Sequence, residues 1–347
     1  MKLLKILRKT THDPLGLFSV CYILLVGFIA IFAEQLAPDS SDNANQMHVS
    51  IHSKPPGFST TLLLIPSADG RLREEIPIRD YRWEGNRLFY TPYGRPEGYV
   101  QEIKSSSFPA GMSRNAITEN YIEERTFLWG TDKFGRDLLS RMLFGSRISF
   151  FIGFIAVLIS LLVGIFFGGI AGYFGGMIDR CIVWLINVMW SIPSLLMVIV
   201  ITLALGKGYW QVFIAVGLTM WVDVARLVRG QVLAIKAYTH VEAAHLLGFS
   251  SLNIFFTHIF PLLIPSLIVI STANFASAIL IESGLSFLGI GAQPPIPSWG
   301  GMVKDHFRYI LLGKPYLALI PGIAIMSLVL AFMQLGNSLR DALDVKN

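Results

Sequence analysis

The sequence predicts an all-α polytopic membrane protein with six transmembrane helices and a large extracytoplasmic insertion, part β, between helices 1 and 2. Hydrophobic residues make up 53% of the 347 residues and charged residues only 15%, whereas about a quarter of a soluble domain is charged. The apolar residues form long blocks, and a block of about 18 or more can span the hydrocarbon core of a bilayer. Basic residues gather at the ends of these blocks, where they set the orientation of the helices.

The first apolar block covers residues 15–33 and follows a short basic N-terminus. A cleaved signal peptide is the competing interpretation, because such a peptide has an apolar core of about 7–15 residues and a small-residue cleavage site. This block is longer, and residues 34–37 (EQLA) make a poor cleavage site. We expect a retained helix, so that residues 1–37 form the cytoplasmic N-terminus and transmembrane helix 1.

The hydrophilic region that follows differs sharply in composition from the apolar blocks. Residues 38–147 hold 14 of the 28 Lys and Arg residues and 14 of the 23 Asp and Glu residues. Short runs that alternate in polarity, such as residues 82–90, are typical of half-buried strands. We therefore expect residues 38–128 to form an extracytoplasmic region that contains β structure.

Five further apolar blocks predict the remaining spans and place a five-helix core within residues 129–347. Basic residues in short loops decide the orientation, whereas long loops count little. With the N-terminus inside, ten basic residues fall on the inner side and four on the outer side, which predicts both termini in the cytoplasm. The blocks are residues 148–172, 182–206, 209–228, 254–281 and 316–336; the inner set is Lys2, Lys5, Arg8, Lys9, Arg180, Arg226, Arg229, Lys236, Arg340 and Lys346, and the outer set is Lys207, Lys304, Arg308 and Lys314.

The composition also argues against several classes of function. Cys21 and Cys181 lie far apart, so they form neither a disulfide framework nor a metal-binding spacing. The net charge of +5 comes from basic residues at helix ends, without a basic stripe interleaved with aromatics, so no nucleic-acid partner is expected. The phosphate-binding pattern G-x-x-x-x-G-K-S/T is absent. We expect a chain that is not an enzyme and holds no metal or cofactor of its own.

One inner loop, residues 229–253, is longer than a membrane turn requires. Residues 241–247 lack Gly and Pro and include good helix formers. Gly248 then supplies the position after the helix, where a left-handed backbone is least strained for glycine, and Ser250 and Ser251 can cap the next helix. The small side chains of Ala243 and Ala244 would let a groove of another protein approach closely. A docking helix and an ordinary amphipathic connector both fit these residues.

This loop resembles a known family of transport proteins. Glu242-Ala243-Ala244, with Gly248 four residues later and Pro261 thirteen residues beyond the glycine, is similar to the EAA loop of permeases in binding-protein-dependent ABC importers. The resemblance implies that the loop docks into a cleft of a cytoplasmic ATPase subunit and transmits its closure on ATP binding. The implied coupling residues are Glu242, Ala243, Ala244, His245, Gly248 and Pro261.

Further stretches are similar to the C-type permeases of dipeptide, oligopeptide and nickel importers. They are residues 129–141 (WGTDKFGRDLLSR) with 145–149 (GSRIS), 172–176 (GYFGG), 282–289 (ESGLSFLG) and 294–300 (PPIPSWG). The resemblance covers residues 129–344, while the long first loop is closer to the microcin-type branch. It implies a bacterial inner-membrane subunit that works with a homologous permease, two ABC ATPase subunits that bind ATP and Mg, and a solute-binding protein. The cargo it implies is a peptide, but dipeptide, longer peptide, modified peptide and metal complex all stay open.

Two groups of polar residues are candidates for gating and for lining the route. Residues 136–144 form an amphipathic stretch that we expect to lie on the outer interface before the second span. There Asp137 and Arg141 are spaced for an ion pair, and the stretch serves either as a gating brace or as a structural entry helix. The interfacial candidates are Asp132, Arg136, Asp137 and Arg141; the route candidates are Asn187, Asn274, Ser277 and Glu282.

Polar groups within a membrane have a structural explanation as well as a functional one. A buried carboxylate such as Glu282 is costly unless paired or wet, and a local hydrogen bond to the backbone near Gly284 is the alternative to a role in transport. Asn and Ser side chains can also hold helices together without touching a substrate. Pro193, Pro261 and Pro265 are expected to kink or interrupt their helices.

Two other functions compete with the importer. A secondary transporter that works alone predicts internal repeats with helices broken at matching positions, and the sequence shows none. A membrane-anchored extracytoplasmic sensor or scaffold requires the EAA resemblance to be accidental. Binding to a nucleotide-driven partner separates the importer from both.

Overall fold

The computed structural model describes residues 13–66, 73–96, 98–109, 111–206 and 208–343. The chain divides into two compact units. The helical unit comprises residues 1–32, 145–304 and 319–347, and the sheet unit comprises residues 33–144 and 305–318. The basic residues among the first nine, Lys207 and Lys346, on which the predicted orientation partly rests, lie outside the described residues.

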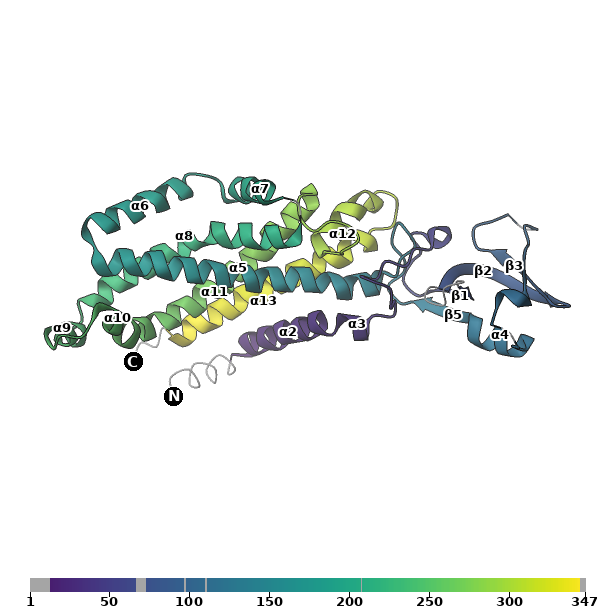
Figure 1. Cartoon of the computed structure of the whole chain (residues 1–347), viewed down its shortest axis with the longest axis horizontal. Coiled ribbons are helices and arrows are strands. Elements are labelled where there is room, and N and C mark those ends of the chain that lie inside the picture. Colours follow the sequence, from purple (N-terminus) through teal and green to yellow (C-terminus); the bar gives the residue numbers. More distant parts are fainter. Residues whose placement is uncertain (1–12, 67–72, 97, 110, 207, 344–347) are drawn as a thin grey trace. The chain divides into compact units, whose positions relative to one another are not determined.

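The described residues contain five helices long and apolar enough to cross a membrane, or six if one bent pair counts as a single span. Several of them run alongside one another in Figure 1. The five are α2 (Pro14–Ile31), α5 (Leu138–Phe174), α8 (Tyr209–Lys236), the run Ser251–Leu288 and α13 (Tyr316–Leu343). The run Ser251–Leu288 consists of α10 (Ser251–Ile254), the π-helical turn η3 (Phe255–Ile259) and α11 (Phe260–Leu288).

The predicted third span is not one straight helix. It is split into α6 (Gly176–Trp190) and α7 (Ser194–Leu205), which meet at an angle of 93°. The break falls at Pro193, which has no amide hydrogen to donate and disfavours helical geometry in the residue before it. The expectation that Pro193 kinks or interrupts its helix is confirmed.

The second span also begins earlier than predicted. Residues 138–144 are the first turns of α5, which continues for 37 residues to Phe174, so a separate interfacial helix over residues 136–144 is wrong. No proline interrupts this stretch, and the α-helical hydrogen bonding therefore continues into the apolar block.

Glycines allow close packing inside the helical unit. Gly164, Gly168 and Gly172 repeat every four residues along α5, and a methyl group on Gly168 would lie only 2.4 Å from the carbonyl oxygen of Ala225 in α8. Small residues at this spacing are a common means of bringing membrane helices together. Helix α2 contacts α13 through a hydrogen bond between two side chains: Tyr22 Oη lies 2.6 Å from Ser327 Oγ.

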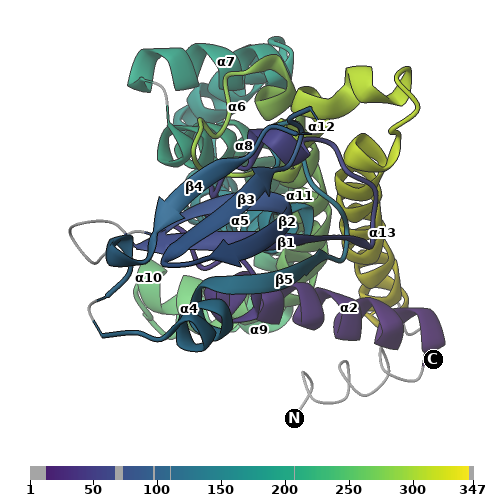
Figure 2. The ribbon, with the colours of Figure 1, turned by 90° about the vertical axis from the view of Figure 1, so that its right-hand side faces the viewer.

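The described residues of the sheet unit form an antiparallel sheet of five strands in the order β4-β3-β2-β1-β5 (Figure 2). Helix α4 (Arg114–Tyr121) packs on it, and the core between them includes Leu62, Ile78, Leu88 and Ile117. The prediction of β structure in the insertion is confirmed, so the chain as a whole is not all-α. The strands are β1 (Phe58–Pro66), β2 (Arg73–Glu84), β3 (Arg87–Pro92), β4 (Gln101–Lys104) and β5 (Ile122–Phe127), and the short elements are α3 (Ala33–Leu36), η1 (Val49–Ile51), η2 (Ser105–Ser107) and η4 (Phe307–Ile310).

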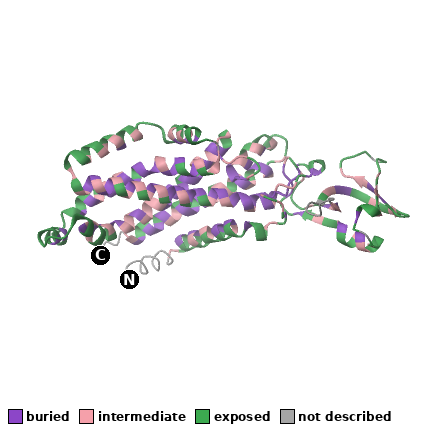
Figure 3. Cartoon of the chain, viewed as in Figure 1, coloured by how far each residue is buried: buried purple, intermediate pink, exposed green. Residues whose placement is uncertain are grey.

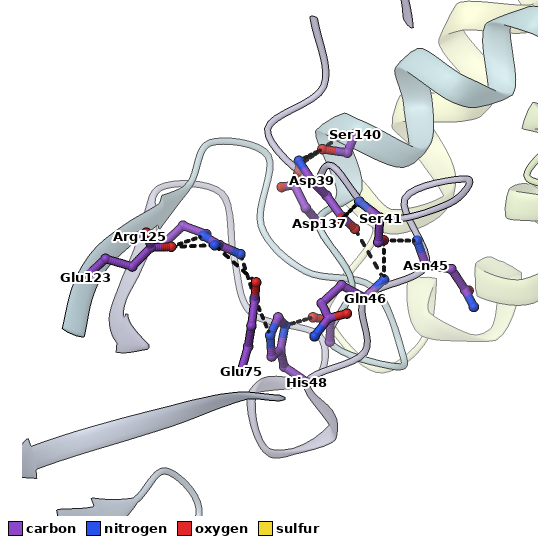
Figure 4. A network of polar contacts seen from close by, with 11 residues as sticks. Asp39, Ser41, Asn45, Gln46, His48, Glu75, Glu123, Arg125, Asp137 and Ser140 are labelled. Carbon is purple, nitrogen blue, oxygen red and sulfur yellow. Dashed lines mark hydrogen bonds and ion pairs between the residues drawn. The ribbon is translucent and has the colours of Figure 1, made fainter. Parts of the chain in front are cut away.

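A polar network joins the segment before the sheet to its strands (Figure 4). His48 Nε2 lies 3.0 Å from a carboxylate oxygen of Glu75, which also accepts a hydrogen bond of 2.8 Å from Arg125. Burial alone raises the pKa of Glu75, but the hydrogen bonds from His48 and Arg125 and the charge of Arg125 outweigh it, so this pKa lies below its ordinary value. The other ring nitrogen of His48 lies 3.3 Å from the carbonyl oxygen of Gly135.

Candidate functional site

The loop between α8 and the run Ser251–Leu288 contains a short helix, α9 (Thr239–Leu246), which follows α8 after a tight turn. Val241 and Ala244 face inward and are 3% and 4% exposed. They pack with Val232, Ile254 and Ile259, which belong to α8 and to the start of the next span. Packing on one face therefore fixes α9 to the two long helices that flank it.

The end of α9 has the geometry that the sequence predicts. Gly248 has φ +80°, in the left-handed region. Its amide donates to the His245 carbonyl at 3.1 Å, and the Phe249 amide donates to the Ala244 carbonyl at 3.3 Å. These two bonds make a Schellman motif, which satisfies helix carbonyls that otherwise lack partners. Ser250 then caps α10 by accepting a hydrogen bond of 3.4 Å from the Asn253 amide, and the prediction of this cap is confirmed.

The opposite face of α9 is exposed. We call it the docking face and define it by Glu242, Ala243, His245, Leu246 and Leu247. Leu246 is 89% exposed and Leu247 is 77% exposed, and Figure 3 shows most of α9 as exposed. Adjacent large apolar side chains that no other part of the chain covers mark interaction surfaces. The arrangement suits binding of another protein.

Pro261 lies in the first turn of α11, directly after the π-helical turn η3. It cannot donate a backbone hydrogen bond, and the wider π turn accommodates that loss. The predicted interruption at Pro261 therefore takes the form of an irregular turn within a continuous run. Pro265 lies inside α11 without ending the helix.

The four route candidates do not come together. Asn274 and Glu282 are buried, 5% and 1% exposed, whereas Ser277 and Asn187 are exposed. Glu282 accepts a hydrogen bond of 2.6 Å from the side chain of Ser286, so the alternative of a bond to the backbone near Gly284 is wrong. Asn187 lies on α6 and accepts a hydrogen bond of 3.5 Å from Arg226 of α8.

The interfacial candidates are all buried in the sheet unit, 0–7% exposed. Asp132 forms ion pairs with Arg136 at 2.6 Å and with Arg141 at 3.7 Å. Asp137 instead accepts hydrogen bonds from the amide and hydroxyl of Ser140, at 2.8 and 2.5 Å. The predicted Asp137–Arg141 ion pair is wrong, because Arg141 turns toward Asp132. Burial raises the pKa of the Asp137 carboxyl, and the hydrogen bonds from Ser140 offset only part of that rise.

Sequence reasoning missed the partners that complete these clusters. Arg136 donates a hydrogen bond of 3.0 Å to Asn45, 91 positions earlier in the chain. In the helical unit, Asp179 of α6 receives two hydrogen bonds from Arg229 of α8, at 2.5 and 2.7 Å. Neither Asn45 nor Arg229 stands in a pattern that points to its partner, so no local signal was available.

The described residues contain no group of three or more His, Cys, Asp or Glu residues arranged to hold a metal ion. The free cysteines Cys21 and Cys181 are both exposed. The exposed side chains on α9 support a binding role.

Comparison with known proteins gives three kinds of match. The family model described as the inner membrane component of binding-protein-dependent transport systems matches residues 164–345. The dipeptide transport system permease protein DppC of Bacillus subtilis is 40% identical over 239 residues, which are 69% of this chain and 75% of that protein. The oligopeptide permease OppC of the same organism is 39% identical, over 63% of this chain and 71% of its own length.

Another relative is the glutathione transport system permease protein GsiD of Pectobacterium atrosepticum, 40% identical over 62% of this chain and 72% of that protein. Among solved structures, a chain of the inward-facing MetNI methionine ABC transporter aligns with a TM-score of 0.48 and 17% identity. That alignment covers 60% of this chain and 97% of the other.

Proposed function

The chain belongs to the family of inner membrane components of binding-protein-dependent transport systems, and from this premise we propose that it is one permease subunit of an ATP-driven peptide importer. Three relatives carry names that specify dipeptides, oligopeptides and glutathione, and peptides are the class that all three share. A second, homologous permease would form the other half of the route, and a solute-binding protein would deliver the peptide from outside.

The docking face on α9 is the observation that carries this proposal. Two ATPase subunits would bind below the membrane, one of them on this face. Closure of the ATPases on ATP would push α9, which packs on α8 and the start of the next span through Val241 and Ala244. The two bundles would then switch the side to which the route opens. A partner can drive such a change only if it binds the two states with different affinity, and the ATPase dimer supplies that difference.

The orientation follows from the same proposal. With α9 in the cytoplasm, both termini are cytoplasmic and the sheet unit is extracytoplasmic. The distribution of basic residues supports this orientation, in particular Arg226, Arg229 and Lys236 near the inner end of α8. The buried ion pairs of Asp132 with Arg136 and Arg141 would hold the stem of the sheet unit.

The route would run along the exposed face of α11. Ser277 lies on that face beside the small residue Ala273, and Leu280 is 53% exposed. Asn274 and Glu282 lie within the bundle behind it, so we assign them to the wall of the route and not to its surface. Asn187 on α6 would take part only if the bent pair α6–α7 moves toward the second permease.

Glu242→Arg is the variant that tests the proposal. The complete complex, with the second permease, the ATPases and the binding protein, is reconstituted in vesicles with labelled peptide. ATP-dependent uptake is expected for the wild type. The variant is expected to lose more than ~90% of both uptake and ATPase copurification, since reversing one charge of a docked pair costs about 2 kcal/mol or more.

Glu119→Arg, an exposed change on α4 of the sheet unit, is the matched control and should change neither measurement. Wild-type copurification by the Glu242→Arg variant would defeat the docking proposal. Uptake by this chain without any ATPase would establish the secondary transporter, and an absence of uptake with an intact outer domain would favour the sensor.

A further inference from the structure

The outer end of α11 carries a chain of three buried side chains, which we call the outer latch: Glu282, Ser286 and Ser298. They are 1%, 3% and 2% exposed. The Ser286 hydroxyl donates to a Glu282 carboxylate oxygen at 2.6 Å, and the Ser298 hydroxyl donates to Ser286 Oγ at 3.1 Å. The hydroxyl protons therefore all point toward Glu282, the acceptor at the end of the chain.

The other end of the latch is the beginning of a second helix, α12 (Trp299–His306). Ser298 precedes α12, and its hydroxyl accepts a hydrogen bond of 3.1 Å from the Gly301 amide. Its carbonyl accepts another of 2.9 Å from the Met302 amide. Ser298 is thus the N-cap of α12, and the latch connects that cap to Glu282 through a single intervening hydroxyl.

Backbone packing brings the two helices into direct contact at the same place. A methyl group on Gly300 would lie 2.6 Å from the Ser283 Cα, and one on Gly291 would lie 2.7 Å from the Ser286 Cα. Only glycine permits such approach, since real Cβ contacts are longer. Trp299 and Met302 of α12 are also buried, 4% and 2% exposed. The close approach of Gly300 to Ser283 and the Ser298–Ser286 hydrogen bond therefore hold the start of α12 to α11.

The polar character of Glu282 is not explained by packing. Its second carboxylate oxygen and the neighbouring Ser283 hydroxyl are buried without a hydrogen-bond partner among the described residues. A buried carboxylate that uses only part of its capacity costs stability, and an apolar side chain of similar size would fill the space at lower cost. Its one hydrogen bond, to Ser286 four residues on in α11, fixes the direction of the hydroxyl that accepts from Ser298 at the start of α12.

We infer that Glu282 is a positioning residue that makes α12 move with α11 as one body. The run Ser251–Leu288 has α9 packed at its inner end and α12 latched at its outer end (Figure 1). A displacement that enters through the docking face thus reaches the outer mouth of the route, where α12 lies. The direction in which movement is transmitted rests on the proposed function. The attachment of α12 to α11 does not depend on that function.

Spin-label distances test the attachment independently of transport. Labels are placed at Leu280 on α11 and Lys304 on α12, both exposed, in a full-length chain in which Cys21 and Cys181 are replaced by Ser. Glu282→Leu should broaden the distance distribution at least about twofold, because the Ser286 hydroxyl loses its acceptor. Glu282→Gln keeps an acceptor oxygen and should give the narrow distribution of the unsubstituted chain.

Uptake in the reconstituted complex tests the consequence. Glu282→Leu should reduce peptide uptake about tenfold, with ATPase copurification and basal ATP hydrolysis unchanged, and Glu282→Gln should restore uptake. Ser298→Ala removes the donor at the α12 end of the latch with little change in volume and should act like Glu282→Leu. Ser271→Ala is the control, because that hydroxyl bonds the carbonyl of Leu267 in its own helix.

The outcomes separate the two proposals. Wild-type distances and uptake in both Glu282→Leu and Ser298→Ala would overturn the latch. If Glu282→Leu fails to assemble, Ser298→Ala decides the question alone, and normal uptake by it would again overturn the latch. Loss of uptake by the unsubstituted chain would count against the proposed function and would leave the spin-label test of the latch intact.

Discussion

Replacing Gly248 with valine is expected to reduce import at least about tenfold while the helical unit stays folded. The backbone at Gly248 has φ +80°, and a residue with a side chain pays about 1–2 kcal/mol in this region, more when it is β-branched. The surroundings are open, with no atom within 4 Å of an added Cβ, so the cost is conformational. The turn would relax to a different backbone and lose the two hydrogen bonds that end α9. The docking face would then present its residues at a wrong angle to the ATPase.

The size of this effect is measured as ATP-dependent peptide uptake by the reconstituted complex. Uptake is expected to fall at least about tenfold for Gly248→Val. Gly248→Asn should retain more, because asparagine tolerates the left-handed region better than other side chains. Gly230→Ala is the matched control, since Gly230 lies within α8 in equally open space and without a positive φ. Wild-type uptake by the valine variant would show that the turn does not position α9.

The second large effect is expected in the sheet unit, at Gly135. This residue has φ +75°, and an added Cβ would lie 1.8 Å from the carbonyl oxygen of His48. Alanine at position 135 would therefore be strained by the positive φ. Its Cβ would also clash with the His48 backbone, which cannot rotate away as a side chain can. The combined cost is about 3–5 kcal/mol, which is a large part of the stability of a domain. The segment that holds His48 would be displaced from the turn that contains Asp132 and Arg136.

Limited trypsin digestion of the full-length chain measures this loss. The Gly135→Ala variant is expected to be cut within residues 73–104 at least about tenfold faster than the wild type, because cleavage follows the population of the open form. Gly85→Ala shares a positive φ of +57° but has no atom within 4 Å of the added Cβ, so it should accelerate cutting far less. Equal rates for the two variants would mean that the contact between Gly135 and His48 does not hold the unit together.

The parts of the structure that sequence reasoning predicted are those that local chemistry determines. The apolar blocks locate the spans because a membrane helix must satisfy its own backbone. The end of α9 follows from Gly248 and the cap from Ser250, since each acts on residues within one turn of itself. Pro193 marks the break between α6 and α7, but its 93° angle depends on packing that a single residue type does not specify.

The features that were missed depend on contacts between distant residues. The partner of Arg141 was predicted from its spacing to Asp137 alone. The structure shows that Arg141 reaches the carbonyl of Ala44, 97 positions away. A spacing of four residues along a helix makes an ion pair between Asp137 and Arg141 possible. It does not form, because Arg141 pairs with the buried Asp132 instead.

The route candidates show where helix geometry could have corrected the prediction. Ser277 and Glu282 are five residues apart, which places them about 140° apart around a helix. They cannot both face the same narrow route, and the structure accordingly exposes Ser277 and buries Glu282. Hydropathy marks both as unusual in a membrane but does not tell which way the helix is turned.

Photocrosslinking in intact cells tests most directly whether α9 meets an ATPase on the cytoplasmic side. A photoreactive residue is placed at Leu246 on the docking face, and another at Leu311, which follows η4 and is 91% exposed against 89% for Leu246. Position 246 is expected to crosslink to the ATPase subunit, and position 311 is not. A crosslink from position 246 to an extracytoplasmic protein would contradict the proposed docking of α9. The absence of any crosslink from position 246 to an ATPase would contradict it as well.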